Sequence, residues 1–138
     1  MSAPTDVTAL GNREFVSLTT FRRTGEPVPT PVWVARDGDA LVVITSAASG
    51  KVKRSRRDPR VVLRPCDRRG TVAPDAPSVE GRAEVVTDAA AQEGPRRALA
   101  AKYGLQWRLV NLMGLVGRLA ELVGRGPGAE RVILRLRN

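Results

Sequence analysis

Histidine is missing from this 138-residue sequence, and cysteine occurs once, at Cys66. Without histidine the chain cannot form a Ser-His-Asp or Cys-His nucleophile system, an imidazole metal ligand or an imidazole proton shuttle. A single cysteine allows neither a zinc-thiolate cluster nor an internal disulfide. Any redox or group-transfer reaction would therefore need a bound cofactor, and the lack of a disulfide favours a reducing, cytoplasmic location.

Aromatic residues and long apolar runs are scarce as well. Phe, Trp and Tyr make up 4% of the residues, so Val, Leu and Ala must fill the interior. No apolar run reaches the ~18 residues of a membrane span, and the first eleven residues lack the basic and apolar regions of a signal peptide. Because 42% of the residues are hydrophobic and there is no repeat or long linker, we expect one domain over residues 1–138.

Short runs rich in β-branched residues, separated by turn residues, predict a mainly β domain with six strands. Pro29 and Pro31 lack the N–H that a central strand uses, so the second run is an edge, a bulge or a ligand-facing stretch. Gly81 is a candidate bulge in the fifth run. The expected strands are Glu14–Arg22, Val28–Arg36, Ala40–Thr45, Arg60–Pro65, Ser78–Thr87 and Arg131–Arg137.

Helical segments are expected between these strands, from their caps and their apolar spacing. Strands joined by hairpins instead of regular crossover helices predict a six-stranded antiparallel barrel of the α+β class, with a helical insertion before the last strand. The expected segments are a short piece capped by Thr5 and ended by Gly11, a basic helix Lys51–Arg57, a helix from its cap Asp88 to Lys102 with an interruption at Gly94-Pro95, and a helix Trp107–Val123.

Positive charge is concentrated between Lys51 and Arg69. The formal net charge is +9, and this stretch holds nine basic residues against two acidic ones, so it carries seven of the nine charges. Such clustering is typical of an anion-binding surface or of a solvated face. A nucleic acid could neutralise it, but the sequence has no groove-reading motif and too few aromatics for a base-stacking platform.

The segment Ser49-Gly50-Lys51-Val52-Lys53 has the composition of a phosphate cradle. Backbone N–H groups after Gly50, at the start of a short helix, can meet phosphate oxygens, while the lysines supply mobile charge and Ser49 a hydroxyl. The nucleotide P-loop pattern GxxxxGK[ST] is absent. A basic surface helix without a ligand explains the same residues equally well.

A linked series of motifs runs through residues 20–81. It comprises T-x-x-x-x-G-x-P from Thr20, T-P-V-W from Thr30, T-x-x-x-S-G-K-x-x-R from Thr45, D-P-R-V from Asp58 and V-E-G from Val79. In this order and spacing the series resembles the flavin/deazaflavin oxidoreductases of the pyridoxamine 5′-phosphate oxidase-like split-barrel superfamily. Within that group it is most similar to the coenzyme F420-dependent class.

The resemblance implies a homodimer that holds its cofactor in a groove between two barrels. It implies a phosphate subsite on the basic helix and a ring subsite along the second and third strands. The implied phosphate residues are Ser49, Gly50, Lys51, Lys53 and Arg57, and the implied ring residues are Thr30, Pro31, Val32, Thr45 and Ser46.

The charge pattern favours coenzyme F420 over FMN. F420 carries a phosphodiester, a carboxylate and an anionic oligoglutamate tail, which suit a dense basic strip through charge-assisted contacts, whereas FMN ends at one phosphate. Deazaflavin hydride transfer needs no protein nucleophile, so we expect no catalytic side chain and no metal. The expected function is an F420-dependent oxidoreductase acting on a small organic acceptor. The alternatives are an FMN-dependent oxidase or reductase of the same fold, and a non-enzymatic cofactor- or nucleic-acid-binding protein.

Other candidate residues have simpler interpretations. Cys66 has no activating partner and is expected to be a buried, inert thiol. Glu80 and Glu84 are expected to form structural ion pairs with arginines, and Trp33 is a core residue at least as often as a ring contact. A further hypothesis is that Tyr103, Gln106 and Trp107 close over the substrate side of the groove.

Overall fold

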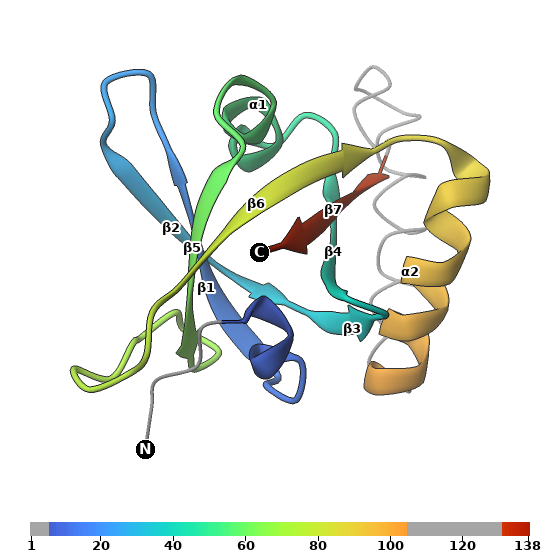
Figure 1. The fold of residues 1–138 in the computed structure, drawn as a ribbon, viewed down its shortest axis with the longest axis horizontal. Coiled ribbons are helices and arrows are strands. Elements are labelled where there is room, and N and C mark those ends of the chain that lie inside the picture. Colours follow the sequence, from blue (N-terminus) through green and yellow to red (C-terminus); the bar gives the residue numbers. More distant parts are fainter. Residues whose placement is uncertain (1–5, 105–130) are drawn as a thin grey trace, which may run out of the picture.

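The computed structural model describes residues 6–104 and 131–138, which form a curled antiparallel sheet with two α-helices and one short 3-10 helix (Figure 1). The mainly β prediction, with a helical insertion before the last strand, is confirmed. In chain order the elements are η1 (Val7–Leu10), β1 (Phe15–Phe21), β2 (Pro27–Trp33), β3 (Ala35–Asp37), β4 (Ala40–Ser46), α1 (Gly50–Arg57), β5 (Arg60–Cys66), β6 (Val79–Val86), α2 (Ala89–Tyr103) and β7 (Arg131–Arg137). The predicted helix Trp107–Val123 lies outside the described residues.

The sheet has the strand order β2-β1-β5-β6-β7-β4-β3, and every pair of neighbours is antiparallel. Its two edge strands, β2 and β3, are consecutive in the chain and separated only by Val34. The sheet must therefore curl until its edges approach, and β2 does lie against β4. The curled sheet is a half-barrel. The sequence predicts its strands individually, and the curl arises from the way in which they pair.

The structure has seven strands where the sequence predicts six, because the expected strand Val28–Arg36 is divided at Val34. The backbone N–H of Val34 donates to the Tyr103 hydroxyl at 3.0 Å, and its carbonyl lies 2.7 Å from that hydroxyl and 2.6 Å from Lys102 Nζ. Two side chains of α2 thus take the hydrogen bonds that a strand neighbour would otherwise provide.

The main core lies inside the curl. Alternate residues of each strand face it, as in β1, where Val16 and Leu18 are fully buried. Helix α1 lies across one end of the curl and contributes Val52 to this core, and η1 covers the opposite end (Figure 1). Helix α2 packs on the outer side, where Leu99 joins a second apolar cluster.

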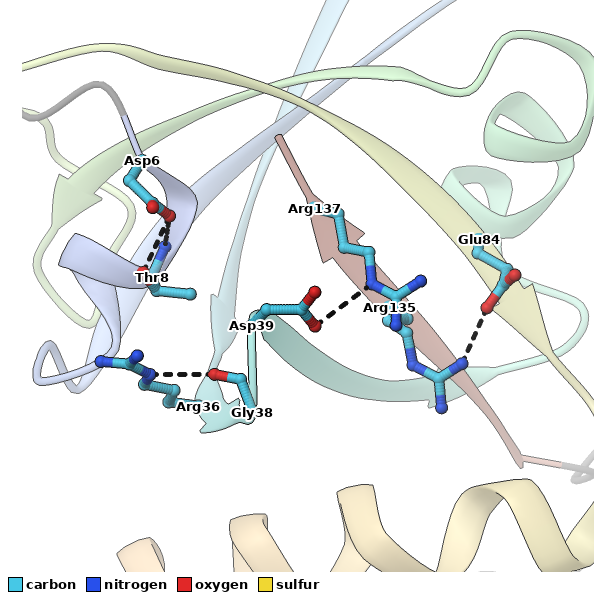
Figure 2. Close-up of polar contacts among 8 residues, drawn as sticks. All are labelled: Asp6, Thr8, Arg36, Gly38, Asp39, Glu84, Arg135 and Arg137. Carbon is cyan, nitrogen blue, oxygen red and sulfur yellow. Dashed lines mark hydrogen bonds and ion pairs between the residues drawn. The ribbon is translucent and has the colours of Figure 1, made fainter.

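Two local predictions, the cap of η1 and the bulge at Gly81, are wrong. Asp6, not Thr5, caps η1, because the Asp6 carboxylate accepts from the Thr8 N–H at 2.9 Å (Figure 2). Gly81 is no bulge, since it pairs one to one with Val61. A glycine is needed there because a Cβ would lie 2.7 Å from the Arg137 carbonyl oxygen.

Helix α2 also differs from prediction, because it continues through Gly94-Pro95 without an interruption. The helix is fixed on both sides of Pro95. The Asp88 carboxylate caps its first turn through the Ala91 N–H, as predicted, and Tyr103 anchors its last turn to the sheet. These anchors offset the backbone hydrogen bond that Pro95 cannot make. No helix in the described part of the chain is long and apolar enough to cross a membrane.

Candidate cofactor-binding site

Helix α1 is a short basic helix between β4 and β5. Val52 and Ser55 are its buried residues, and the Asp58 N–H donates to the Arg54 carbonyl where the helix ends. Its polar positions are occupied by Lys51, Lys53, Arg54, Arg56 and Arg57, with no acidic residue in the helix. The predicted helix is confirmed, starting one residue earlier at Gly50.

Two arginines of α1 are docked on the end of β1. Arg54 Nε donates to the Thr20 hydroxyl at 2.6 Å, and Arg57 Nη2 donates to the Phe21 carbonyl at 2.7 Å. The Arg54 guanidinium also lies across the first residue of its own helix, because a Cβ added to Gly50 would lie 2.6 Å from Arg54 Nη1. Glycine at position 50 therefore leaves the space that this guanidinium occupies.

The cations of α1 lower one another's affinity for protons. Burial lowers the pKa of the Lys51 ammonium, and the nearby charge of Arg54 lowers it further. Burial also lowers the pKa of Arg54, with additional repulsion from Arg22 and Arg57. Neither Lys51 nor Arg54 forms an ion pair with a carboxylate of residues 6–104 or 131–138. A half-buried group of like charges without a counter-ion is suited to binding an anion.

The end of β4 leads directly into this basic group. Thr45 faces the core and is buried, and its hydroxyl lies 3.4 Å from the Ser49 hydroxyl, which occupies the N-cap position of α1. Ser46 points to the opposite face of β4 and accepts from the Ala48 N–H at 3.2 Å. The end of β4, predicted for the ring subsite, therefore lies close to the start of α1, predicted for the phosphate subsite.

The predicted ring residues of β2 are divided between two faces of the strand. Thr30 and Val32 pair with Leu18 and Val16, two core residues of β1, whereas Pro31 pairs with Ser17 and is exposed on the outer face. Of the three alternatives for the strand with the prolines, an edge, a bulge or a ligand-facing stretch, the sheet order shows that it is an edge. Because β2 lies against β4, the curl brings the strand of Thr30 and the strand of Thr45 together.

Arg54 is the residue that sequence reasoning missed. It closes the T-x-x-x-S-G-K-x-x-R motif and follows Lys51 by three positions, a spacing that places two side chains on the same face of a helix. This spacing could have identified it. Its contact with Thr20, 34 positions away in sequence, could not be read from the pattern alone.

The other candidate residues have mainly structural environments. Burial, followed by the Asp67 charge, raises the pKa of the half-buried Cys66 thiol, which agrees with an inert cysteine. Glu84 forms the predicted ion pair with Arg135 at 2.9 Å (Figure 2). Glu80 forms none with the residues described, so that prediction is wrong.

The aromatic residues near α2 are packed against each other. Trp33 stacks on Tyr103 with ring centroids 4.6 Å apart and planes at 11°, which favours the core interpretation of Trp33. Tyr103 is buried and its hydroxyl is fully engaged, so it is not free to close over a groove. The other two residues of that hypothesis, Gln106 and Trp107, lie outside the described residues.

Two open pockets lie away from the predicted site. One of about 540 Å³ is lined by the start of β5, the first half of β6 and Asn138. The other, of about 440 Å³, is lined mainly by the end of β5 and the loop that follows it. Neither is lined by any of the ten predicted cofactor residues. Within the part of the chain that is described, no group of three or more His, Cys, Asp or Glu could hold a metal ion.

Comparison with known proteins identifies the relationship. The family model for pyridoxamine 5′-phosphate oxidase matches residues 5–121. Conserved hypothetical protein Rv2991 from Mycobacterium tuberculosis is similar in fold, with a TM-score of 0.63 and 24% identity over 94% of this chain and 76% of that one. None of the curated proteins compared with the chain matches it.

Two other solved structures with this fold have informative descriptions. An F420 reductase matches with a TM-score of 0.53 and 23% identity over 94% of this chain and 90% of its own. An FAD-binding protein from Mesorhizobium loti matches with a TM-score of 0.59 and 17% identity over 93% of this chain and 81% of its own. At these identities the likeness concerns the fold.

Proposed function

The chain belongs to the pyridoxamine 5′-phosphate oxidase family, and we propose that it is a coenzyme F420-dependent oxidoreductase, transferring hydride between reduced F420 and a small organic acceptor. The split-barrel fold supports a flavin- or deazaflavin-type oxidoreductase. The observation that carries the choice of F420 is the charge of α1, which has five basic and no acidic residues. One phosphate would leave most of these cations without a partner.

The environment of α1 fits a cofactor with several negative charges. Lys51 and Arg54 are half-buried and have no carboxylate partner among the described residues. Burial and then the Arg54 charge lower the pKa of Lys51, and burial and then the charges of Arg22 and Arg57 lower the pKa of Arg54. An anion between them would relieve this repulsion through charge-assisted hydrogen bonds. The Ser49 hydroxyl is not used to cap α1, which leaves it available to donate to a phosphate oxygen.

Each group of residues has a separate task in this proposal. When bound, the deazaflavin supplies the hydride carrier. The residues of α1 bind and orient the phosphate end of the cofactor, while β2 and β4, which lie against each other, hold the ring and exclude water from it. The phosphate group comprises Ser49, Gly50, Lys51, Lys53 and Arg57, joined now by Arg54, and the ring group comprises Thr30, Pro31, Val32, Thr45 and Ser46.

We further propose that the protein acts in the cytoplasm as a homodimer. The outer face of β2 carries Pro27, Pro29 and Pro31, all exposed. Prolines have no N–H group, so this strand cannot extend the sheet by hydrogen bonds to a second copy at its edge. A row of exposed prolines instead favours packing of the outer face of β2 against the second copy. The unpaired thiol of Cys66 is compatible with a reducing compartment.

Fluorescence titration with F420 and with FMN tests the choice of cofactor. We expect F420 to bind at least about tenfold more tightly, since one additional charge-assisted contact contributes enough free energy for that difference. The difference in affinity between F420 and FMN should become smaller as the salt concentration rises, because salt screens exposed charges. Equal affinities, or a preference for FMN, would contradict the F420 assignment and support the FMN-dependent alternative.

Turnover separates an enzyme from a binding protein with the same site. Reduced F420 should remain reduced when mixed with the protein alone and be oxidised when a conjugated organic acceptor is added. A cofactor-storage protein would bind F420 but not accelerate its oxidation with any acceptor. Binding of nucleic acid through α1 would instead show no dependence on the cofactor ring and a steep loss of affinity with salt.

A further inference from the structure

Thr20 is a buried polar residue whose contact crosses between two motifs. It lies on the core-facing side of β1 in line with Val16 and Leu18, and its exposed fraction is 0%. Its hydroxyl accepts from Arg54 Nε at 2.6 Å. The first residue of the T-x-x-x-x-G-x-P motif therefore touches the last residue of the T-x-x-x-S-G-K-x-x-R motif.

This contact determines which edge of the Arg54 guanidinium is free. A guanidinium is planar and rigid, so fixing Nε fixes the directions of both Nη atoms. Thr20 holds Nε from the side of β1, and the missing side chain of Gly50 lets Nη1 lie across the first turn of α1. The two Nη atoms form no hydrogen bond with the described residues, which leaves two parallel donors beside Gly50 at the start of α1.

We propose that Thr20 is a positioning residue for anion binding: its hydroxyl holds Arg54 so that both Nη groups face one phosphate-type anion together with Lys51. The inference rests on the proposed function for the natural ligand, which is a phosphate ester. It concerns Thr20, which is not among the proposed cofactor-binding residues, and the orientation of Arg54 instead of the choice of cofactor. Two parallel N–H donors match two oxygens of one phosphate, which a freely rotating arginine would meet less often.

Thr20→Val removes the hydroxyl and retains the shape and β-branching of the side chain. Inorganic pyrophosphate, measured by titration calorimetry, is the first probe because it contains no ring. We expect its affinity to fall about three- to tenfold in Thr20→Val, as expected when an arginine loses one orienting hydrogen bond. Thr20→Ser retains the hydroxyl and should restore affinity to within about twofold.

Two controls separate positioning from a general loss of stability. Thr19→Val makes the same change one residue earlier, where the side chain points to the opposite face and forms no hydrogen bond with the described residues, and should leave pyrophosphate affinity unchanged. In an Arg54→Met background, Thr20→Val should have no additional effect, because the group that it positions is absent. A merely structural threonine would lower affinity equally in both backgrounds.

F420 and its phosphate-free chromophore form the second pair of probes. Thr20→Val should lower the affinity for F420 and leave the affinity for the chromophore unchanged. Equal pyrophosphate affinity in the wild type and Thr20→Val, additive effects of the two substitutions, or a wild type that does not bind pyrophosphate would each overturn the inference. A wild type that binds pyrophosphate in a Thr20-dependent way but neither F420 nor FMN would leave the inference standing and overturn the proposed function.

Discussion

Lys51 and Lys53 lie on α1 with one residue between them, yet their environments differ. Lys51 is half-buried with a lowered pKa, beside the Arg54 guanidinium, whereas Lys53 is exposed. A charge in a partly dehydrated position contributes more to anion binding than one in water, because water screens the exposed charge. The sequence alone assigns both lysines to the same phosphate subsite, and their different burial distinguishes them.

Lys51→Ala should therefore lower the affinity for F420 by about ten- to a hundredfold, since a hydrogen bond to a charged group contributes roughly 1.5–3 kcal/mol. Lys53→Ala should lower the F420 affinity by a smaller factor. Arg68→Ala, in the exposed loop after β5, should lower it least of the three. Cofactor titration beside the thermal midpoint measures both properties. Unchanged binding in Lys51→Ala would mean that α1 is a solvated basic face.

Gly50→Ala should weaken cofactor binding without lowering the stability of the fold. The new Cβ would lie 2.6 Å from Arg54 Nη1, the end of a flexible side chain, so the guanidinium moves and the fold survives. Alanine is the better helix former by up to about 1 kcal/mol, so the thermal midpoint should stay or rise. The affinity for F420 should fall several-fold. Gly94→Ala in α2 is the matched control, and should leave F420 affinity at the wild-type value.

Helices and strands could be predicted where each depends on its own residues. Runs of β-branched and other apolar residues were enough to predict β1, β4 and β7 to within a residue or two, because each of these strands packs apolar side chains on the core. The break at Val34 could not be predicted, since it depends on Tyr103, 69 positions away. The close approach of Gly81 to the Arg137 carbonyl likewise requires β6 and β7 to be paired first.

Tyr103→Phe tests the anchor between α2 and the strand break. The substitution keeps the ring that stacks on Trp33 but leaves the Val34 N–H without its acceptor, so the free energy of unfolding at pH 7 should fall by about 1–3 kcal/mol. Chemical denaturation of both proteins provides the measurement. A loss below about 0.5 kcal/mol would show that water replaces the hydroxyl and that the anchor is dispensable.

The same variant should remove part of the pH dependence. Burial raises the pKa of Tyr103 to about 12 in the folded protein, against about 10 in the unfolded chain. Between these values the unfolded chain loses the proton that the folded protein keeps, so wild-type stability falls as pH rises from about 10 to 12. Lys102, whose pKa burial lowers, contributes the opposite slope to both proteins. The difference between wild type and Tyr103→Phe should therefore narrow across this window, and a constant difference would contradict the assignment.

The whole molecule combines a mixed-charge half with a strongly basic end. Around the C-terminal strand, arginines are paired with carboxylates, as Arg137 is with Asp39 at 3.5 Å (Figure 2). The five basic residues of α1 carry part of the chain's net charge of +9, and none of them forms an ion pair with a carboxylate of the described residues. The sequence was enough to predict the fold and the basic helix α1, on which the proposed phosphate subsite lies. The ring half was less accessible, because the strand alternation that separates Pro31 from Thr30 and Val32 becomes meaningful only once the inner face of the curl is known.

Assembly provides the test at the largest scale. The exposed prolines on the outer face of β2 cannot pair edge to edge, so a dimer formed there must bury the face of the strand. Light scattering should give twice the 14.9 kDa chain mass at micromolar concentration. Pro29→Lys places a charge on this face and should shift the mass to that of a single chain while the thermal transition remains cooperative. Lys53→Ala, on α1, should leave the mass of the dimer unchanged. A wild-type protein that stays monomeric at tens of micromolar would contradict the homodimer, and with it the expectation that the cofactor lies in a groove between two barrels.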